Sequence, residues 1–228
     1  MRHLELPYLP QLQADSPLYL ISGELDLLPV QPIDQEPWPM PGEKPRVTFA
    51  MAHNRDCLFL KFYVTERTVQ ARYRNTNDHV YRDSCVEFFI SFQGEPSYYN
   101  FEFNCLGTCR AGFGPDRQNR ELLSTDTISR IRRSAKLQAS QETTPYKTWH
   151  LTLIFPAEVF SEHPSLQLEE AAPSANFYKC GDELPEPHYL AWNNILTPEP
   201  NFHLPEFFGC MQLLQTQPET VKHRKYTR

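Results

Sequence analysis

The chain has 228 residues, enough for one large domain or at most two small ones. Aromatic residues make up 13% of it and prolines number 21 against 8 glycines, which favours a β protein with shaped loops over a helical bundle. The net charge of −6 argues against a nucleic-acid partner, which would require a basic surface. No stretch approaches the ~18 apolar residues of a membrane-spanning helix, so a membrane is not an expected partner either.

The N-terminal segment and the cysteines bear on the cellular compartment. Glu5, Pro7 and Pro10 interrupt what would be the apolar core of a signal peptide. If Met1 is the natural start, the sequence predicts a cytoplasmic protein; otherwise a secreted or periplasmic location stays open. The six cysteines form no CxxC pair, and a chain of this size does not require disulfides, so we expect free thiols, several of them buried in strands.

Proline content and polarity divide the chain into three regions. Residues 1–45 hold nine of the 21 prolines and are expected to wrap the domain surface as extended chain and short edge strands, because proline cannot donate to a sheet ladder. Trp38 is expected to pin this wrap to the core. Residues 46–214 carry the strand patterns of a single domain, and residues 215–228 form a polar tail that we expect to fray.

Short strands follow one another through the central region, and no long amphipathic helix is predicted. Outside one hairpin, we expect strands at residues 47–52, 57–64, 128–139, 149–155, 176–179, 189–192 and 209–214. A turn or short helix is expected at 156–160, and Trp149 is expected in the core. Short strands with turn-rich gaps are typical of an all-β, antiparallel, jelly-roll-like sandwich with little helix.

The most informative pattern is the hairpin. Residues 84–92 and 98–105 both alternate between apolar and polar side chains and are joined by a loop at 93–97, which predicts an antiparallel pair. Its polar row, expected to face away from the core, comprises Glu87, Asn100, Glu102 and Asn104. If polar residues pair across the strands, Glu87 lies close to Glu102, and the two like charges need a shared proton, a cation or ligand hydroxyl groups. An ordinary solvated face explains the same pattern.

One motif resembles that of a known family. The segment YRDSCVEFFI at residues 81–90 resembles the aromatic-x-x-Asp-x-Val-Glu-hydrophobic signature of family 9 carbohydrate-binding modules. The surrounding strands resemble those of the family in the same order, from about Ile21 to Leu214. The segments at 176–182 and 188–192 resemble a bacterial family-9-like subgroup.

The resemblance implies a β-sandwich that binds a mono- or oligosaccharide between two aromatic rings and catalyses no reaction. One of these rings falls on Tyr81, and the other resembles Trp192. The acidic binding residue falls on Glu87, and a binding asparagine falls on Asn104. Such modules usually serve an enzyme, so a separate glycoside hydrolase acting in polysaccharide degradation is an expected partner. No cofactor is required, although family modules often carry structural calcium.

Three positions depart from the family pattern. Tyr81 stands where the family usually has a tryptophan, Phe89 stands where it has a polar binding residue, and Glu102 stands where it has an arginine. These departures put a glucose-type ligand in doubt. The expected ligand-binding residues are therefore Tyr81, Glu87, Phe89, Glu102, Asn104 and Trp192.

Other functions remain open from the residues alone. In a glycoside hydrolase, Glu87 and Glu102 would be the carboxylate pair, and a cysteine nucleophile would draw on Cys180, Asp182 and His188. A haem-binding sandwich would need an axial Met or His, and none lies in a clear motif. The fold could also persist after the sugar site was lost.

Overall fold

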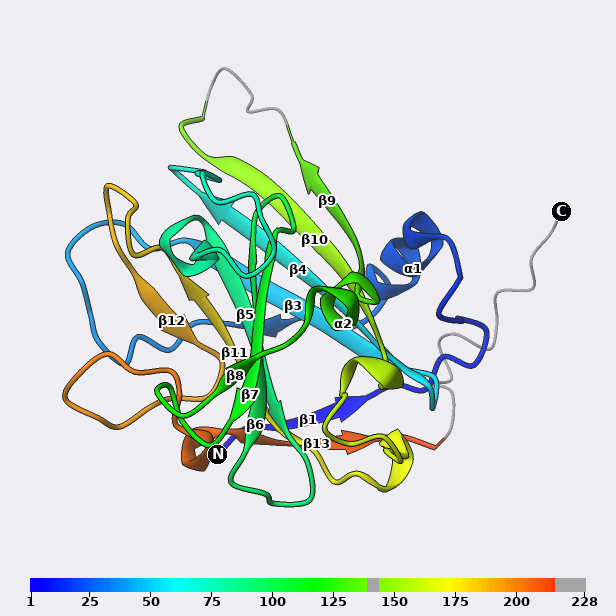
Figure 1. The fold of residues 1–228 in the computed structure, drawn as a ribbon. Helices are drawn as coiled ribbons and strands as arrows, with labels where there is room; N and C mark the ends of the chain where they lie inside the picture. The colour runs from blue at the N-terminus through cyan, green and yellow to red at the C-terminus, as the bar shows by residue number, and fades with distance from the viewer. Residues whose placement is uncertain (139–143, 216–228) are drawn as a thin grey trace, which may run out of the picture.

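In the residues that the computed structural model describes, 1–138 and 144–215, two β-sheets pack face to face (Figure 1). The first sheet contains, in spatial order, β1 (His3–Leu6), β13 (Gly209–Leu213), β11 (Ser174–Cys180), β5 (Cys85–Ser91), β6 (Tyr98–Asn104), β7 (Cys109–Gly114) and β8 (Glu121–Leu122), with β12 (Tyr189–Ala191) paired to β11. The second contains β2 (Gln31–Pro32), β3 (Arg46–His53), β4 (Cys57–Glu66), β10 (Lys147–Pro156) and β9 (Arg132–Leu137). The predicted all-β sandwich is confirmed.

Helices are short and lie outside the two sheets. They are α1 (Leu18–Leu25), α2 (Thr125–Ser129) and the 3-10 helices η1 (Val80–Arg82), η2 (Ala157–Val159), η3 (Leu168–Glu170) and η4 (Pro205–Phe207). Helix η2 matches the turn or short helix expected after Pro156. In the described part of the chain, no helix has the length and apolar character needed to cross a membrane.

The N-terminal region and the strand expected at 128–139 differ from expectation. Helix α1 interrupts the N-terminal wrap and packs Ile21 and Leu25 against the outer side of the second sheet. Ile128 lies in α2 rather than in a strand, because Ser124 caps that helix by accepting a hydrogen bond from the Thr127 amide at 3.0 Å. The strand β9 begins only at Arg132. Residues 139 and 216–228 of the predicted strand and tail lie outside the described residues.

The space between the sheets is filled by aliphatic and aromatic side chains. Strands β5 and β6 pair antiparallel in the expected register, with Glu87 directly opposite Glu102. Phe88 points between the sheets, where its ring centroid lies 5.4 Å from that of Phe155 and 5.1 Å from that of Phe177. Aromatic rings at such distances add to the stability that burial itself provides.

The outer face of the first sheet is also covered, contrary to the exposed polar face that the hairpin pattern predicted. Every residue of β5 and β6 is buried. The segment 195–208 and the N-terminal wrap lie over this face and form a second apolar cluster with Phe89, Tyr98 and Tyr178. As expected, Trp38 anchors the wrap; its indole N–H donates to the Thr197 carbonyl at 2.8 Å.

The six cysteines are free thiols, as the sequence predicted. Cys210 is exposed and the others are buried. Cys57 faces the cluster beneath α1, and burial raises the pKa of its thiol to about 12. Buried thiols of this kind pack as small apolar groups.

Candidate functional site

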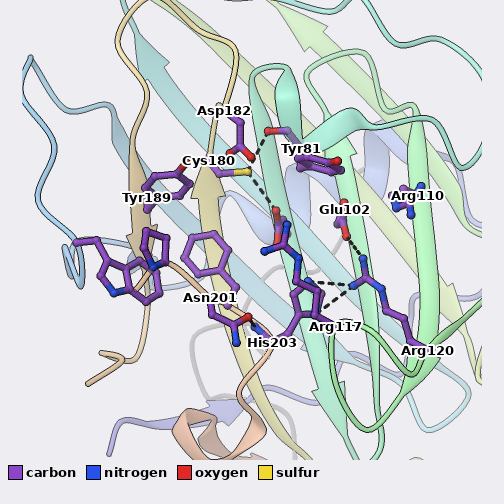
Figure 2. A pocket seen from close by; sticks show the side chains of 14 residues that line it. Tyr81, Glu102, Arg110, Arg117, Arg120, Cys180, Asp182, Tyr189, Asn201 and His203 are labelled. Atoms are coloured by element: carbon purple, nitrogen blue, oxygen red, sulfur yellow. Dashed lines mark hydrogen bonds and ion pairs between the residues drawn. The ribbon is translucent and has the colours of Figure 1, made fainter. Parts of the chain in front are cut away.

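A cleft of about 410 Å³ opens on the outer face of the first sheet, where its cover is incomplete (Figure 2). Its floor is formed by Glu87 on β5, Glu102 on β6 and Cys180 at the end of β11. One wall, called here the aromatic wall, comprises Trp38, Tyr189 and Phe202. The other, called here the arginine wall, comprises Arg110, Arg117 and Arg120. Tyr81 from η1 and Asp182 from the loop after β11 complete the lining.

The two floor carboxyls are almost completely shielded from solvent, with exposed fractions of 3% for Glu87 and 2% for Glu102. The Cys180 thiol donates to Glu87 Oε1 at 3.1 Å, and Asn100 Nδ2 donates to Glu102 Oε1 at 2.9 Å. Burial raises the pKa of both carboxyls, and the charge of Glu102 raises that of Glu87 further. Glu102 Oε2 has no hydrogen-bond partner within the described chain. The floor therefore offers both donors and acceptors to a polar ligand.

Asp182 is the third carboxyl in the cleft. Its backbone amide donates to the Tyr81 carbonyl at 3.2 Å, which ties the loop after β11 to η1. Burial raises the pKa of its carboxyl, against a lowering effect of Arg117 and Arg82. Burial and the nearby Asp182 carboxyl raise the pKa of the Tyr189 hydroxyl to about 12, so an acidic group lies beside that ring.

The aromatic rings of the cleft come from both sides. Tyr81 and Tyr189 are half-buried, and Figure 2 shows them well apart, with Tyr81 near Glu102 and Tyr189 across the cleft from both. Tyr189 is held by edge contacts to Trp38 and Phe202, with ring centroids 6.3 and 6.1 Å away. The cleft therefore pairs two apolar ring faces with a polar floor.

Trp192 does not line the cleft, and the expectation that it is the second exposed ring is wrong. Its indole is fully buried between the sheets, with its ring 5.6 Å from Phe177. A Cβ on Gly209 would lie only 2.3 Å from the indole, so the ring packs directly on the β13 backbone. Successive side chains alternate between the faces of a strand. Trp192 therefore faces inwards with Leu190, and Tyr189 faces the cleft.

Phe89 and Asn104 also stand outside the cleft lining. Phe89 lies on the outer face beneath His203, with ring centroids 4.8 Å apart, and thus supports a residue that does line the cleft. Asn104 is fully buried and donates through Nδ2 to Asp83 Oδ2 at 3.0 Å and to the Tyr73 carbonyl at 2.8 Å. Its side chain holds the loop before η1. Of the six expected ligand-binding residues, the cleft brings together Tyr81, Glu87 and Glu102.

The arginine wall and Tyr189 were not identified from the sequence. Arg117 and Arg120 lie in an irregular loop after β7, and no motif marks such positions. Tyr189 could have been found by alternation, because it has the opposite parity to the apolar Leu190 and Trp192.

The nucleophile constellation considered from the sequence is not assembled. Cys180 and Asp182 line the cleft, but His188 is buried elsewhere, 2.8 Å from Lys179 Nζ. Burial raises the pKa of the Cys180 thiol well above its ordinary value, which disfavours the reactive thiolate.

His203 is the histidine that lines the cleft, and it is already engaged. Nδ1 lies 2.8 Å from the Tyr98 hydroxyl, and Arg120 Nη1 lies 3.0 Å from both ring nitrogens. Burial and the neighbouring arginines lower its pKa to about 2, so it is neutral at ordinary pH. The lining contains no methionine, so the haem alternative finds no free axial ligand there.

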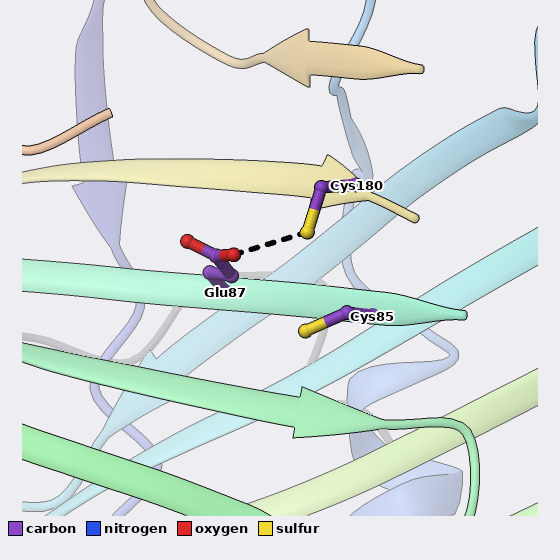
Figure 3. A group of neighbouring side chains, drawn as sticks. All are labelled: Cys85, Glu87 and Cys180. Carbon is purple, nitrogen blue, oxygen red and sulfur yellow. Dashed lines mark hydrogen bonds between the residues drawn. The ribbon is translucent and has the colours of Figure 1, made fainter. Parts of the chain in front are cut away.

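Cys85, Glu87 and Cys180 are the one group of three or more His, Cys, Asp or Glu side chains in the described residues whose ligand atoms lie within 4.8 Å of one another (Figure 3). The two cysteines are directly opposite each other on β5 and β11. Calcium takes six to eight oxygen ligands, so two thiols and one carboxyl do not fit the calcium expected from the family resemblance. Two of its members, Glu87 and Cys180, are joined by a hydrogen bond and belong to the cleft floor.

Comparison with known proteins places this geometry in a family. Residues 21–213 match the family model described as carbohydrate-binding family 9. A proposed carbohydrate-binding protein from Bacteroides uniformis is 30% identical, with a TM-score of 0.83 over 93% of this chain and 99% of that chain. No curated protein sequence matches the chain.

Two solved structures of a family 9 module from Caldicellulosiruptor kristjanssonii share the fold. The complex with glucose is 9% identical, with a TM-score of 0.56 over 96% of this chain and 98% of that chain. The complex with cellotriose is 10% identical, with a TM-score of 0.55 over the full length of both chains. At such low identity the likeness concerns the fold alone. The match across residues 21–213 and the 30% identical relative establish that the chain belongs to carbohydrate-binding family 9.

Proposed function

We propose that the protein binds a mono- or oligosaccharide in the outer-face cleft and catalyses no reaction. The observation that carries the proposal is a single cleft in which the rings of Tyr81 and Tyr189 line the walls and the carboxyls of Glu87 and Glu102 form the floor. Membership of the family and the sugar complexes of the two Caldicellulosiruptor structures support the same function.

The two kinds of group in the cleft match the two kinds of surface on a sugar. A pyranose ring has apolar C–H faces, which pack against aromatic rings such as Tyr81 and Tyr189. Its hydroxyl groups both donate and accept hydrogen bonds, as the floor carboxyls and the Cys180 thiol do. Few such contacts in a cleft open to solvent give a dissociation constant on the order of micromolar to millimolar.

The floor carboxyls are already engaged within the protein. A glycosidase needs one carboxyl to protonate the leaving group and a second to act as nucleophile or base. Glu87 Oε1 accepts a hydrogen bond from the Cys180 thiol and Glu102 Oε1 accepts one from Asn100, and both side chains are nearly shielded from solvent, which favours binding over hydrolysis. Binding without turnover would suit a partner of a separate glycoside hydrolase, which remains part of this proposal.

Calorimetric titration with glucose, cellotriose and a panel of neutral and acidic glycosides tests the proposal. We expect Tyr81→Ala and Tyr189→Ala each to weaken binding at least ~tenfold, the loss of one ring contact. Tyr19→Ala is the matched control, because Tyr19 is 80% exposed on α1, far from the cleft. Binding that survives both cleft substitutions, or turnover of a chromogenic glycoside, would contradict the proposal.

A further inference from the structure

The arginine wall concentrates positive charge in a chain whose net charge is −6. Arg110 lies on β7 directly opposite Glu102, and Arg117 and Arg120 come from the loop that follows β7. In Figure 2, Arg110 and Arg120 occupy the side of the cleft that faces Tyr189 across the floor. The aromatic wall thus faces Arg110 and Arg120 across the floor, and Tyr81 lies on the arginine side, near Glu102.

The guanidinium groups of this wall have more donors than the protein uses. Arg117 forms neither a hydrogen bond nor a salt bridge with any residue that the structure describes. Arg110 donates through Nη1 to the Asn77 carbonyl at 2.7 Å, but its Nε is buried with no partner in the described chain. Arg120 Nη2 is 3.6 Å from Glu102 Oε1, which is an ion pair without a direct hydrogen bond. Each guanidinium carries five N–H donors, so several remain available.

Three carboxyls, those of Glu87, Glu102 and Asp182, line the same cleft as the arginines. Burial raises the pKa of each, against a lowering effect of the neighbouring arginines, so the charge that opposes the arginine wall is reduced. Arginine stays charged under all ordinary conditions. Positive charge in a partly desolvated wall is stabilised by an anionic partner.

We infer that the sugar bound in this cleft carries a negatively charged group, a carboxylate or a sulfate ester, held by Arg110, Arg117 and Arg120. This inference rests on the proposed function, because it names the class of sugar for the same cleft. With the ring between Tyr81 and Tyr189, an exocyclic anionic group at its edge meets the arginine wall. The planar guanidinium matches two oxygens of a carboxylate or sulfate, and such pairs are about twice as strong as neutral hydrogen bonds.

Matched ligand pairs test the inference. We would titrate the protein, in low salt, with methyl glycosides of glucose and galactose, with the corresponding glucuronide and galacturonide, and with the 6-O-sulfated sugars. We expect at least one acidic ligand to bind ~tenfold or more tightly than its neutral parent, the effect of one charge-assisted pair. That preference should shrink as salt is added, because Arg117 is exposed and its charge is screened.

Two variants locate the preference. Arg117→Gln should lower the ratio of acidic to neutral affinity several-fold while the melting temperature holds, because the side chain is exposed and makes no contact needed for folding. Arg130→Gln removes an exposed arginine after α2, outside the cleft, and should leave the ratio unchanged. A preference unaffected by Arg117→Gln and Arg110→Gln together would overturn the assignment to this wall.

The outcomes separate the inference from the proposed function. Binding of uronides alone, or of sulfated sugars alone, supports the inference and identifies the anion. If a neutral parent binds as tightly as every acidic ligand, the inference fails and sugar binding stands. If no ligand of either kind binds, the proposed function fails and the inference falls with it.

Discussion

The two faces of strand β5 are both buried, but one carries apolar core side chains and the other carries a carboxyl of the candidate site. Val86, Phe88 and Ile90 point between the sheets into an apolar core. Glu87, one residue from Phe88, points to the outer face, where it meets Cys180 and Glu102. Burial of carboxyls destabilises a fold unless they are well paired. Burial alone therefore does not distinguish the core of this protein from its site. The polar side chains on the outer face do.

The largest loss of stability should come from a substitution on the inner face of the first sheet. Trp192→Ala removes a fully buried indole from between the sheets and should lower the free energy of unfolding by about 4 kcal/mol. Tyr189→Ala, three residues away on the half-buried cleft side, should lower it by much less. Urea denaturation of both variants measures the difference. Equal losses would show that the two rings have the same structural role.

The next largest effect on stability should come from the buried ion pair between Lys179 on β11 and Glu66 on β4. Lys179 Nζ lies 3.0 Å from Glu66 Oε2, and the two side chains are 0% and 4% exposed. Lys179→Met leaves the Glu66 charge without its partner and should lower the free energy of unfolding by about 3 kcal/mol.

The double variant Lys179→Met with Glu66→Gln is the control for that prediction. It removes both charges and keeps an acceptor for the Trp149 indole N–H, which donates to Glu66 Oε1 at 2.7 Å. It should recover most of the loss. A double variant as unstable as the single one would mean that packing, not charge, accounts for the effect.

A smaller effect, dependent on pH, should come from the outer face. Since the pKa of Glu87 is raised in the folded protein, the folded state keeps a proton that the unfolded chain releases above about 4.5. The contribution of Glu87 to stability is therefore present below that pH and is lost as the pH rises towards the folded pKa. Glu87→Gln should remove this loss, so that stability measured from pH 4.5 to 8 falls less than in the wild type.

Glu121→Gln serves as the control for the pH prediction, because Glu121 is exposed on β8. It should leave the pH profile of the wild type unchanged. A Glu87→Gln profile parallel to that of the wild type would show that the carboxyl is not the source of the pH dependence.

The smallest expected effect is a difference in the rates at which a reagent modifies the thiols of Cys210 and Cys180. Cys210 is exposed, whereas Cys180 lies on the cleft floor with its pKa raised by burial. A thiol reagent should therefore modify Cys210 first and Cys180 slowly. Ligand in the cleft should slow Cys180 further and leave Cys210 unaffected. Modification of Cys180 as fast as that of Cys210 would show that the floor is open to solvent.

The inner face was largely predictable from the sequence, and the outer face was not. Period-2 alternation located β5 and β6 and their register, including the pairing of Glu87 with Glu102. Alternation cannot show what covers a polar row, because the cover comes from distant segments such as 195–208 and Trp38. The hairpin's polar side chains were therefore expected in solvent.

The site residues likewise divide into those that the sequence predicted and those that it did not. Tyr81, Glu87 and Glu102 lie in or beside the strand that carries the family motif, and they reach the cleft. Trp192 directly follows β12 and has the same parity as the inward-facing Leu190, and its ring is part of the core. Arg117 and Arg120 come from a loop whose path no local pattern fixes.

The roles of the two rings are tested most directly by comparing Tyr189→Ala with Trp192→Phe in calorimetric titrations of the sugar that binds best. The Trp192 indole N–H has no partner in the described residues, so Trp192→Phe removes ring volume but no hydrogen bond. We predict that Tyr189→Ala weakens binding at least ~tenfold while the melting temperature holds, and that Trp192→Phe lowers the melting temperature while Kd holds. Loss of binding in Trp192→Phe with full binding in Tyr189→Ala would contradict the assignment of Tyr189 to the site and Trp192 to the core.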